Sequence, residues 1–380
     1  MSRILYFTRD YTTHDHRFLS ALAETSHQVF YLRLEQRGHI LEDRPVPSGI
    51  TEVDWAGGKQ PFNWAKKESL TADLQRVIHE IQPDLIQAGP VQTSAYLVAR
   101  TGFKPLVTVS WGSDLLVDAH KSHRYGEITR FTLGHSSALV GDCQPVEEAA
   151  IAYGMPPEKI VTFPWGVDLN HFSPAQPASE KPLFSDQPQR PFVVLSTRAW
   201  EPIYGVEILA QGFVLAAREI PDLRLVMLGN GSLASKLRTI FESGEVMDRV
   251  LFAGQITQND LPRYYRNADL YLSASRSDGT SISLLEALAC GRPALVSDIP
   301  GNQAWIEPGV QGWWFSDGSP QSLADALWEA FAHRQDIPKM GRSARRLAEE
   351  RANWSENFKK LQIAYDLALN TSIVPSIKSA

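Results

Sequence analysis

Two successive runs of alternating strand and helix patterns constrain this chain more than any other feature. Short apolar segments rich in β-branched and aromatic residues alternate with helical patterns, which is typical of βαβ units on a parallel sheet. The chain has 380 residues, more than one hydrophobic core usually supports. We therefore predict an α/β protein with two doubly wound, Rossmann-like parallel-sheet domains. The predicted strands are 4–7, 28–33, 85–87, 106–110, 138–140 and 160–163, then 192–196, 223–228, 250–252, 270–273 and 294–297.

A polar, proline-rich stretch separates the two runs and indicates a linker over 173–190. The expected organisation is an N-terminal domain over 1–172, a C-terminal domain over 191–352, a helix over 353–370 and a mobile tail over 371–380. Open parallel sheets bind ligands beyond the carboxyl ends of their strands. We therefore expect the functional residues just after strands, around a cleft between the domains.

The charge balance argues against nucleic acid as a partner. The chain has 37 Lys and Arg against 43 Asp and Glu, a net charge of −6, and so lacks the basic excess of a nucleic-acid groove. Its two cysteines, Cys143 and Cys290, are too few for a disulfide framework. No stretch reaches the roughly 18 apolar residues of a membrane span. The expected location is the cytoplasm, with peripheral membrane contact left open.

The segment 275–293 has the strongest chemical signal. A strand runs into a Gly/Thr/Ser turn, and a helix begins near Ser281, so the amides of Thr280, Ser281 and Ile282 are expected to form an anion site at a helix N-terminus. Asp278 and Glu286 would flank that anion and accept hydrogen bonds from sugar hydroxyls. The alternative is that Thr280 or Ser281 only caps a helix, with Glu286 on a solvated or salt-bridged face.

This segment and three others resemble a known family. The others are 108–115, 164–174 and 222–231, in family order. Together they are similar to the retaining glycosyltransferases of family 4, which have the GT-B fold. The resemblance implies transfer of a sugar from a nucleotide-diphosphate sugar to an acceptor hydroxyl with retention of configuration, with no metal and no further cofactor. A nucleotide-sugar epimerase or phosphorylase of the same fold, or a non-catalytic partner subunit, remains an alternative.

The family also implies a division of labour. The C-terminal domain would bind the nucleotide sugar, and the N-terminal domain an acceptor sugar, lipid-linked sugar or small molecule. The helix over 353–370 would cross back to the N-terminal domain. Nucleotide sugar and acceptor are thus the expected partners.

The resemblance assigns specific donor residues. Glu286 would bind the ribose hydroxyls, Asp278 with the backbone of Gly279 and Thr280 would hold the transferred sugar, and Arg198 would neutralise the departing diphosphate. Taken alone, Arg198 is also consistent with a structural salt bridge at a strand end. The other donor positions are Tyr204, Gly229, Gly231, Gln255, Ile256, Ser281, Ile282 and Leu285.

The sequence departs from the family pattern at several positions. Asp278 stands where Glu is usual, Tyr204 where Lys is expected, and the segment beginning at Trp111 lacks the common His-Gly pair. His14 or His16 is expected to supply the missing imidazole as a catalytic group. The alternative is that both histidines only hydrogen-bond their loop and Trp111 is core. The expected acceptor-side residues are Thr12, Thr13, His14, Trp111 and Asp114.

An aromatic segment in the first half has two interpretations. Trp55, Phe62 and Trp64, with Lys66 and Lys67, would form an acceptor wall or a membrane-facing loop. Aromatic residues around a Gly-Gly turn more often pack locally, which is the alternative.

Overall fold

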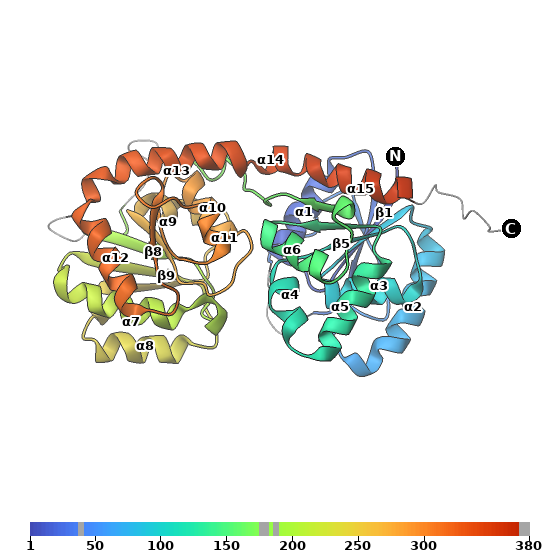
Figure 1. Ribbon diagram of the computed structural model, residues 1–380, viewed down its shortest axis with the longest axis horizontal. Helices are drawn as coiled ribbons and strands as arrows, with labels where there is room; N and C mark the ends of the chain where they lie inside the picture. Colours follow the sequence, from blue (N-terminus) through green and yellow to red (C-terminus); the bar gives the residue numbers. More distant parts are fainter. Residues whose placement is uncertain (37–41, 175–181, 185–189, 372–380) are drawn as a thin grey trace. The chain divides into compact units, whose positions relative to one another are not determined.

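A computed structural model describes residues 1–36, 42–174, 182–184 and 190–371. Most of the linker expected over 173–190, and the tail expected over 371–380 apart from its first residue, lie outside the described residues. The described chain forms two compact units, each with a parallel sheet (Figure 1). The predicted pair of Rossmann-like domains is confirmed.

The units do not divide where the sequence suggested. Unit 1 comprises Met1–Phe163 and the segment from Phe358 onward, and unit 2 comprises Pro164–Asn357. Residues 164–172 therefore belong to unit 2, because Val167 forms a parallel bridge with Asn353 there.

The single helix expected over 353–370 is wrong. The chain forms α14 (Trp354–Asn357) in unit 2 and α15 (Lys359–Thr371) in unit 1. The side chain of Asn357, at the end of α14, donates to the carbonyl oxygens of Pro164 and Arg351 at 3.0 and 2.8 Å. Asn357 therefore ties the end of α14 to unit 2, and the chain enters unit 1 at the next residue.

The sheet of unit 1 is parallel, with the strand order β3-β2-β1-β4-β5-β6-β7 among the described residues. Its strands are β1 (Arg3–Thr8), β2 (Gln28–Arg33), β3 (Ile50–Glu52), β4 (Leu85–Gly89), β5 (Leu106–Val109), β6 (Ala138–Gly141) and β7 (Ile160–Thr162). Its other helices are α1 (Thr13–Ala23), α2 (Lys67–Ile81), α3 (Tyr96–Thr101), α4 (Ser113–Leu116), α5 (His123–His135) and α6 (Gln144–Ala152).

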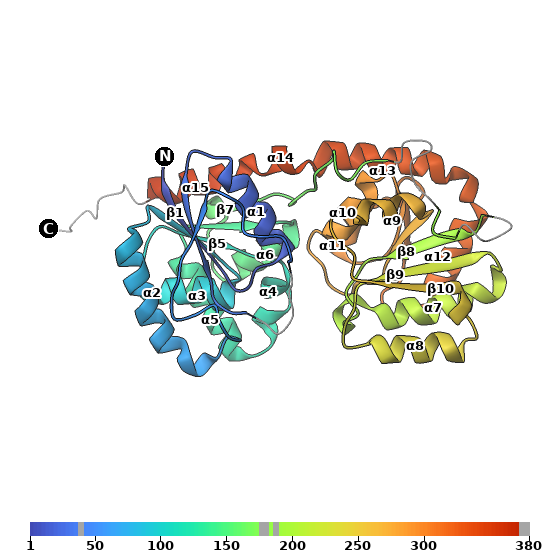
Figure 2. The same cartoon turned by 180° about the vertical axis from the view of Figure 1, so that it is seen from behind.

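Helices cover the sheet of unit 1 because their apolar residues share one face. In α2, Leu70, Leu74, Val77 and Ile81 follow helical spacing and are all buried against the sheet. From the C-terminal part of the chain, α15 packs along β4 to β7. Figure 2 shows α1 and α15 on the same side of this sheet.

The sheet of unit 2 is also parallel, with the order β10-β9-β8-β11-β12-β13 among the described residues. Its strands are β8 (Phe192–Ser196), β9 (Leu223–Leu228), β10 (Val250–Gly254), β11 (Leu270–Ser273), β12 (Ala294–Ser297) and β13 (Gly312–Phe315). Its other helices are α7 (Val206–Glu219), α8 (Ala234–Ser243), α9 (Leu261–Asn267), α10 (Ile282–Ala289), α11 (Pro300–Gln303), α12 (Pro320–Ala332) and α13 (Ile337–Arg351).

Both faces of this second sheet are buried. In β8, Phe192 and Val194 join the core with α7, α8 and α12, whereas Val193 and Leu195 join the core with α9, α10 and α13. Figure 1 shows these two helix layers on opposite faces. Full burial of one such apolar side chain contributes roughly 1.5–3 kcal/mol, which explains the near-continuous apolar runs of these strands.

No helix in the described ranges is both long enough and apolar enough to span a membrane.

Candidate functional site

The residues singled out in the second half of the sequence lie beyond the carboxyl ends of four neighbouring strands. Arg198 follows β8, Gly229 and Gly231 follow β9, Gln255 follows β10, and Asp278 follows β11. Because β10, β9, β8 and β11 are adjacent and parallel, these ends meet at one edge of the sheet. The strand order thus brings together residues that are distant in the sequence.

Arg198 is the centre of this edge. Its Nη1 donates to the hydroxyls of Ser281 and Ser283 at 2.8 and 3.1 Å, and its Nη2 lies 2.7 Å from Oδ2 of Asp278. Its Cζ lies 4.2 Å from the centre of the Tyr204 ring. Burial lowers the pKa of Arg198, but the charge of Asp278 and the nearby tyrosines outweigh burial and raise it. The guanidinium is therefore a fixed, largely buried positive charge.

Glu286 lies inside the fold on α10. Its side chain is buried, and its Oε2 accepts a hydrogen bond of 2.8 Å from the hydroxyl of Tyr265. Burial and the charge of Glu286 raise the pKa of Tyr265 well above its usual value, so this tyrosine stays a hydrogen-bond donor. The interpretation of Glu286 as a solvated face residue is wrong.

The turn before α10 is packed tightly. Thr280 and Ser281 are buried, and Ser281 makes no capping hydrogen bond with its side chain, because its hydroxyl accepts from Arg198 instead. A Cβ on Gly301 of α11 would lie 2.3 Å from the carbonyl oxygen of Asp278 and 2.4 Å from that of Gly279. Only glycine allows α11 to approach this turn so closely.

The remaining expected donor residues differ in accessibility. The amide of Gly229 donates to the carbonyl of Gly254 at 2.7 Å, which joins the ends of β9 and β10. Gln255 is exposed, and Ile256 is half-buried against the core. Leu285 is fully buried, and its side chain packs α10 against the core.

The loop after β1 in unit 1 is organised by a helix cap. Thr12 and Asp15 form a capping box at the start of α1, in which Oδ2 of Asp15 accepts from the amide of Thr12 at 2.9 Å. The hydroxyl of Tyr6 donates to Oδ1 of Asp15 at 3.0 Å. Burial raises the pKa of Asp15 to about 6. Thr13 is half-buried in the first turn of α1.

The two histidines of this loop have different surroundings. His14 stacks on Trp111, which follows β5, with ring centres 5.3 Å apart and planes at 29°. Nδ1 of His16 lies instead 2.8 Å from the hydroxyl of Tyr11, and burial with the charge of Arg44 lowers the pKa of His16. The structure therefore brings His14, and not His16, together with Trp111. Trp111 is half-buried and not a core residue.

Asp114 has structural partners. It is buried, and its carboxylate accepts from the hydroxyl of Ser110 at 2.6 Å and from the amides of Val91 and Leu115 at 3.0 and 3.1 Å. Burial raises its pKa. Asp114 thus connects the segment after β4 to the segment after β5.

The aromatic segment around Trp55 packs locally. Trp55 is buried, its ring meets Phe7 edge-on at 5.3 Å, and its Nε1 donates to the carbonyl of Arg33 at 2.7 Å. Phe62 packs edge-on against Trp64 at 5.1 Å. Local packing, the commoner outcome for aromatic residues around such a turn, is therefore confirmed for Trp55.

Two protein-family models match this chain and divide it nearly as the fold does. The model of the glycosyl transferases of group 1 matches residues 180–360, and the model of glycosyltransferase family 4 matches residues 12–171. The chain belongs to the group 1 glycosyltransferases. The resemblance to glycosyltransferase family 4 and the GT-B fold are confirmed.

One sequence relative and two solved structures are consistent with this family and fold. It is 26% identical to a D-inositol 3-phosphate glycosyltransferase of Paenarthrobacter aurescens, over 93% of this chain and 92% of the relative. A sucrose-phosphate synthase of Thermosynechococcus elongatus has a TM-score of 0.81 at 17% identity, covering 98% and 100% of the two chains. HepE of Anabaena, solved with UDP and glucose, has a TM-score of 0.78 at 19% identity, covering 96% and 100%.

Two residues of the glycosyltransferase's candidate site were not predictable from the family pattern. Ser283 contacts Arg198, and its hydroxyl lies 2.8 Å from that of Tyr271. Tyr265, on α9, donates to Glu286. The position of Ser283 in the first turn of the helix after the Gly/Thr/Ser turn was a usable signal. Tyr265 had none, because its contact depends on how α9 and α10 pack.

Proposed function

We propose that this glycosyltransferase moves a sugar from a nucleotide-diphosphate sugar bound by unit 2 to a hydroxyl of an acceptor bound by unit 1. We further propose that the anomeric configuration is retained and that no metal ion takes part. The observation that carries the proposal is the cluster of Arg198, Asp278 and Ser281 beyond the end of β11, with the buried Glu286 further along α10, the helix that begins after Ser281. A permanent positive charge paired with a carboxylate suits a ligand that has both phosphates and hydroxyls.

Arg198 would stabilise the leaving group. The diphosphate gains negative charge as the bond to the sugar breaks, and a guanidinium binds phosphate oxygens in a planar, two-pronged geometry. The ion pair with Asp278 and the bonds to Ser281 and Ser283 hold that guanidinium in place before the donor binds. A preorganised charge of this kind acts without reorganisation during the reaction.

The two carboxylates would orient the hydroxyl groups of the donor. Asp278 would accept hydrogen bonds from the transferred sugar once phosphate oxygens compete for Arg198. Glu286 would accept from the ribose, with Tyr265 fixing its carboxylate. No protein nucleophile is needed, because the acceptor hydroxyl attacks from the face that the diphosphate leaves, and the diphosphate takes its proton.

The acceptor would bind in unit 1 near the loop after β1. The stacked rings of His14 and Trp111 support this assignment, because an indole surface binds the apolar face of a sugar while an imidazole supplies a hydrogen bond. His16 is engaged by Tyr11 and is assigned no catalytic role.

The first experiment is a thermal-shift comparison of UDP, GDP, ADP and TDP, with UDP first because structural neighbours were solved with it. A nucleotide at one hundred times its Kd adds about 2.7 kcal/mol to the free energy of unfolding. The matching sugar nucleotides are then incubated with methyl glycosides in the presence of EDTA, and NMR reports the product anomer. A product with the donor's own anomeric configuration is expected.

Other outcomes would contradict the proposal in recognisable ways. Conversion of the donor without an acceptor into its epimer would indicate an epimerase. Tight nucleotide binding with neither transfer nor donor hydrolysis would indicate a non-catalytic subunit. A product with inverted anomeric configuration would contradict the proposed retention. Loss of turnover in the presence of EDTA would contradict the proposal that no metal ion takes part.

A further inference from the structure

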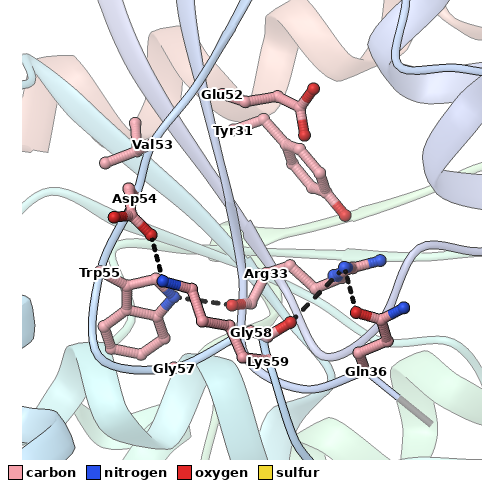
Figure 3. Close-up of a pocket in the computed structure, with 10 residues that line it drawn as sticks. All are labelled: Tyr31, Arg33, Gln36, Glu52, Val53, Asp54, Trp55, Gly57, Gly58 and Lys59. Carbon is pink, nitrogen blue, oxygen red and sulfur yellow. Dashed lines mark hydrogen bonds and ion pairs between the residues drawn. The ribbon is translucent and has the colours of Figure 1, made fainter. Parts of the chain in front are cut away.

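A small pocket opens beyond the carboxyl ends of β2 and β3 in unit 1, and its lining includes Trp55 but none of the residues assigned above to the donor or to the loop after β1. Its volume is about 190 Å³. Tyr31 pairs in register with Glu52, and Arg33 lies two residues further along β2, so the three side chains share one face of the sheet. Figure 3 shows the Tyr31 hydroxyl and the Arg33 guanidinium directed into the same space.

The hydroxyl of Tyr31 lacks a hydrogen-bond partner among the described residues. The side chain is only 4% exposed, and the hydroxyl oxygen itself is buried. The rings of Tyr6 and Tyr11, with centres 6.2 and 5.8 Å away, hold the Tyr31 ring in this orientation. Buried hydroxyls nearly always have a partner, because an unpaired one lowers stability. This hydroxyl is therefore suited to a ligand in the pocket.

The wall beside Tyr31 is rigid and polar. Nη2 of Arg33 donates to the Gln36 side chain at 3.2 Å and to the carbonyl of Gly58 at 3.5 Å. A Cβ on Gly58, whose φ is +84°, would lie 2.9 Å from the carbonyl oxygen of Arg33, so the turn can approach β2 only as glycine. The indole of Trp55 donates to the same carbonyl oxygen.

The charges around the pocket balance. The lining residues Arg33 and Lys59 are cationic, and Glu52 and Asp54 are anionic. Lys59 pairs with Asp54 at 2.9 Å on the exposed rim, and Nη1 of Arg33 lies 3.9 Å from Oδ1 of Asp10, which is not a lining residue. This balance does not favour a strongly charged ligand. Donors next to acceptors instead match hydroxyl groups, which accept from a guanidinium and donate to a carboxylate. The volume is below the roughly 300–1,000 Å³ of pockets for drug-sized ligands and fits one sugar ring.

We propose that this pocket binds one uncharged sugar ring of the acceptor, with Tyr31, Arg33 and Glu52 as its hydrogen-bonding groups. The inference rests on the proposed function and makes the acceptor a glycoside with at least one sugar beside the reacting one. Tyr11 connects the two places: its ring packs on Tyr31, and the next residue, Thr12, is the N-cap of α1 and one of the expected acceptor-side residues. The sugar in the pocket is not itself changed by the reaction.

The test uses the full chain and a panel of methyl glycosides: glucoside, galactoside, mannoside and N-acetylglucosaminide. Saturation-transfer NMR measures binding to the wild type, to Tyr31→Phe and to the control Tyr125→Phe, a tyrosine of α5 whose ring contacts Trp64 outside the pocket. At least one glycoside is expected to bind, with an affinity roughly three- to tenfold weaker for Tyr31→Phe and unchanged for the control. Glu52→Gln is also expected to weaken the binding of that glycoside.

A stability measurement separates a ligand-binding role from a structural one. Because the Tyr31 hydroxyl lacks a partner, Tyr31→Phe is expected to keep or raise the Tm of the ligand-free protein. A lower Tm would mean that the hydroxyl stabilises the fold, and it would overturn the inference. So would equal glycoside binding by Tyr31→Phe and the wild type, absence of binding by the whole panel, or binding of inorganic phosphate in place of the glycosides.

The outcome is independent of the proposed function itself. Donor hydrolysis without acceptor is measured for the wild type and Tyr31→Phe. Equal hydrolysis together with unchanged glycoside binding refutes only the pocket. Absence of both nucleotide binding and hydrolysis in the wild type refutes the proposed function.

Discussion

Arg198 shows how a single side chain depends on contacts from several segments. Ser281 and Ser283 accept its hydrogen bonds, Asp278 balances its charge, and Tyr204 covers its flat face. The aromatic ring stands where the family resemblance suggested a second cation. A cation over a ring face gains roughly 0.5–2 kcal/mol depending on how far it is desolvated. Tyr204 therefore stabilises the charge that the missing lysine would have repelled.

The first prediction concerns the donor edge. Arg198→Ala is expected to lower kcat/KM by about 10²–10³, because the leaving diphosphate loses its fixed positive charge. Glu286→Gln keeps the shape and is expected to raise the KM of the donor. Arg238→Ala is the control, since Arg238 only covers the ring of Phe252. Steady-state kinetics of the three variants make the comparison, and near wild-type values for Arg198→Ala would remove the donor-site assignment.

The second prediction concerns the stacked pair in unit 1. Trp111→Ala is expected to raise the acceptor KM, because the sugar loses a flat apolar surface. His14→Ala is expected to lower kcat instead. The nucleotide Kd, measured by calorimetry, should stay the same in both, because the nucleotide binds in unit 2. A changed nucleotide Kd or an unchanged acceptor KM for Trp111→Ala would contradict the assignment.

Single residues were predictable only where the sequence itself carried the pattern. The spacing of Asp278 and Glu286 around a Gly/Thr/Ser turn indicated two carboxylates near an anion site. The structure places Asp278 at the sheet edge beside Arg198 and Glu286 in the interior, on α10 against Tyr265. The partners Tyr265 and Ser283 were not predicted, and neither was the use of the Ser281 hydroxyl by Arg198. These contacts join residues up to 85 positions apart, so they depend on packing.

At the level of elements, the third prediction follows from the cap of α1. Burial raises the pKa of Asp15 from 3.8 to about 6, so the folded protein binds this proton more tightly than the unfolded chain does. Between about pH 4 and pH 6 the contribution of Asp15 to the free energy of unfolding therefore falls as pH rises, by up to about 3 kcal/mol. Asp15→Asn cannot titrate. The difference in Tm, Asp15→Asn minus wild type, is expected to be more positive at pH 7.5 than at pH 4.5. The same difference at both pH values would contradict this prediction.

The fourth prediction concerns the approach of α11 to the turn after β11. Gly301→Ala is expected to displace the backbone of Asp278 and Gly279, lowering both Tm and kcat/KM, because its Cβ would overlap their carbonyl oxygens. Gly134→Ala in α5 is the matched control. A Cβ there meets nothing within 4 Å, and helix propensity favours alanine by roughly 1 kcal/mol. Equal Tm changes for the two variants would refute the close approach.

The predicted strands were mostly those with unbroken apolar runs, and the two missed strands lie at sheet edges. The strand β3 has only three residues and ends in a glutamate, and β13 begins with glycine. Three residues are too few to show an alternating pattern in β3, whereas β13 is mostly buried and its short run Gly-Trp-Trp-Phe was a usable signal. The division of 353–370 into α14 and α15 was also not predictable, because both parts have helical composition and the break depends on a tertiary contact of Asn357.

At the level of the whole molecule, chain length and the repeated alternation were enough to predict two domains. The domain boundary at 163 could not be predicted in this way. It depends on the pairing of Val167 with Asn353, two residues that are far apart in the sequence. Likewise, the participation of α15 in unit 1 came only from the family resemblance. Nothing in the composition of this helix indicates which sheet it covers.

The fifth prediction tests the contribution of α15. Tyr365→Ala is expected to destabilise unit 1 by roughly 3–5 kcal/mol, because it removes a fully buried ring whose hydroxyl donates to Gln87. Ile363→Ala, about half exposed on the same helix, is the control. Hydrogen exchange followed by mass spectrometry should show faster exchange in β4 to β6 and no change in unit 2. If hydrogen exchange became faster to the same extent in both units, this would contradict the prediction that α15 stabilises unit 1 alone.

The origin of unit 1 from both ends of the chain affects the order of events during synthesis. A ribosome completes β1 to β7 long before it reaches α15, so the strands that α15 covers emerge without their helix. Unit 2 is made entirely from one continuous stretch, so none of its strands waits for a segment translated outside it. The unit whose strands are translated first therefore gains α15 only after the whole of unit 2 has been translated.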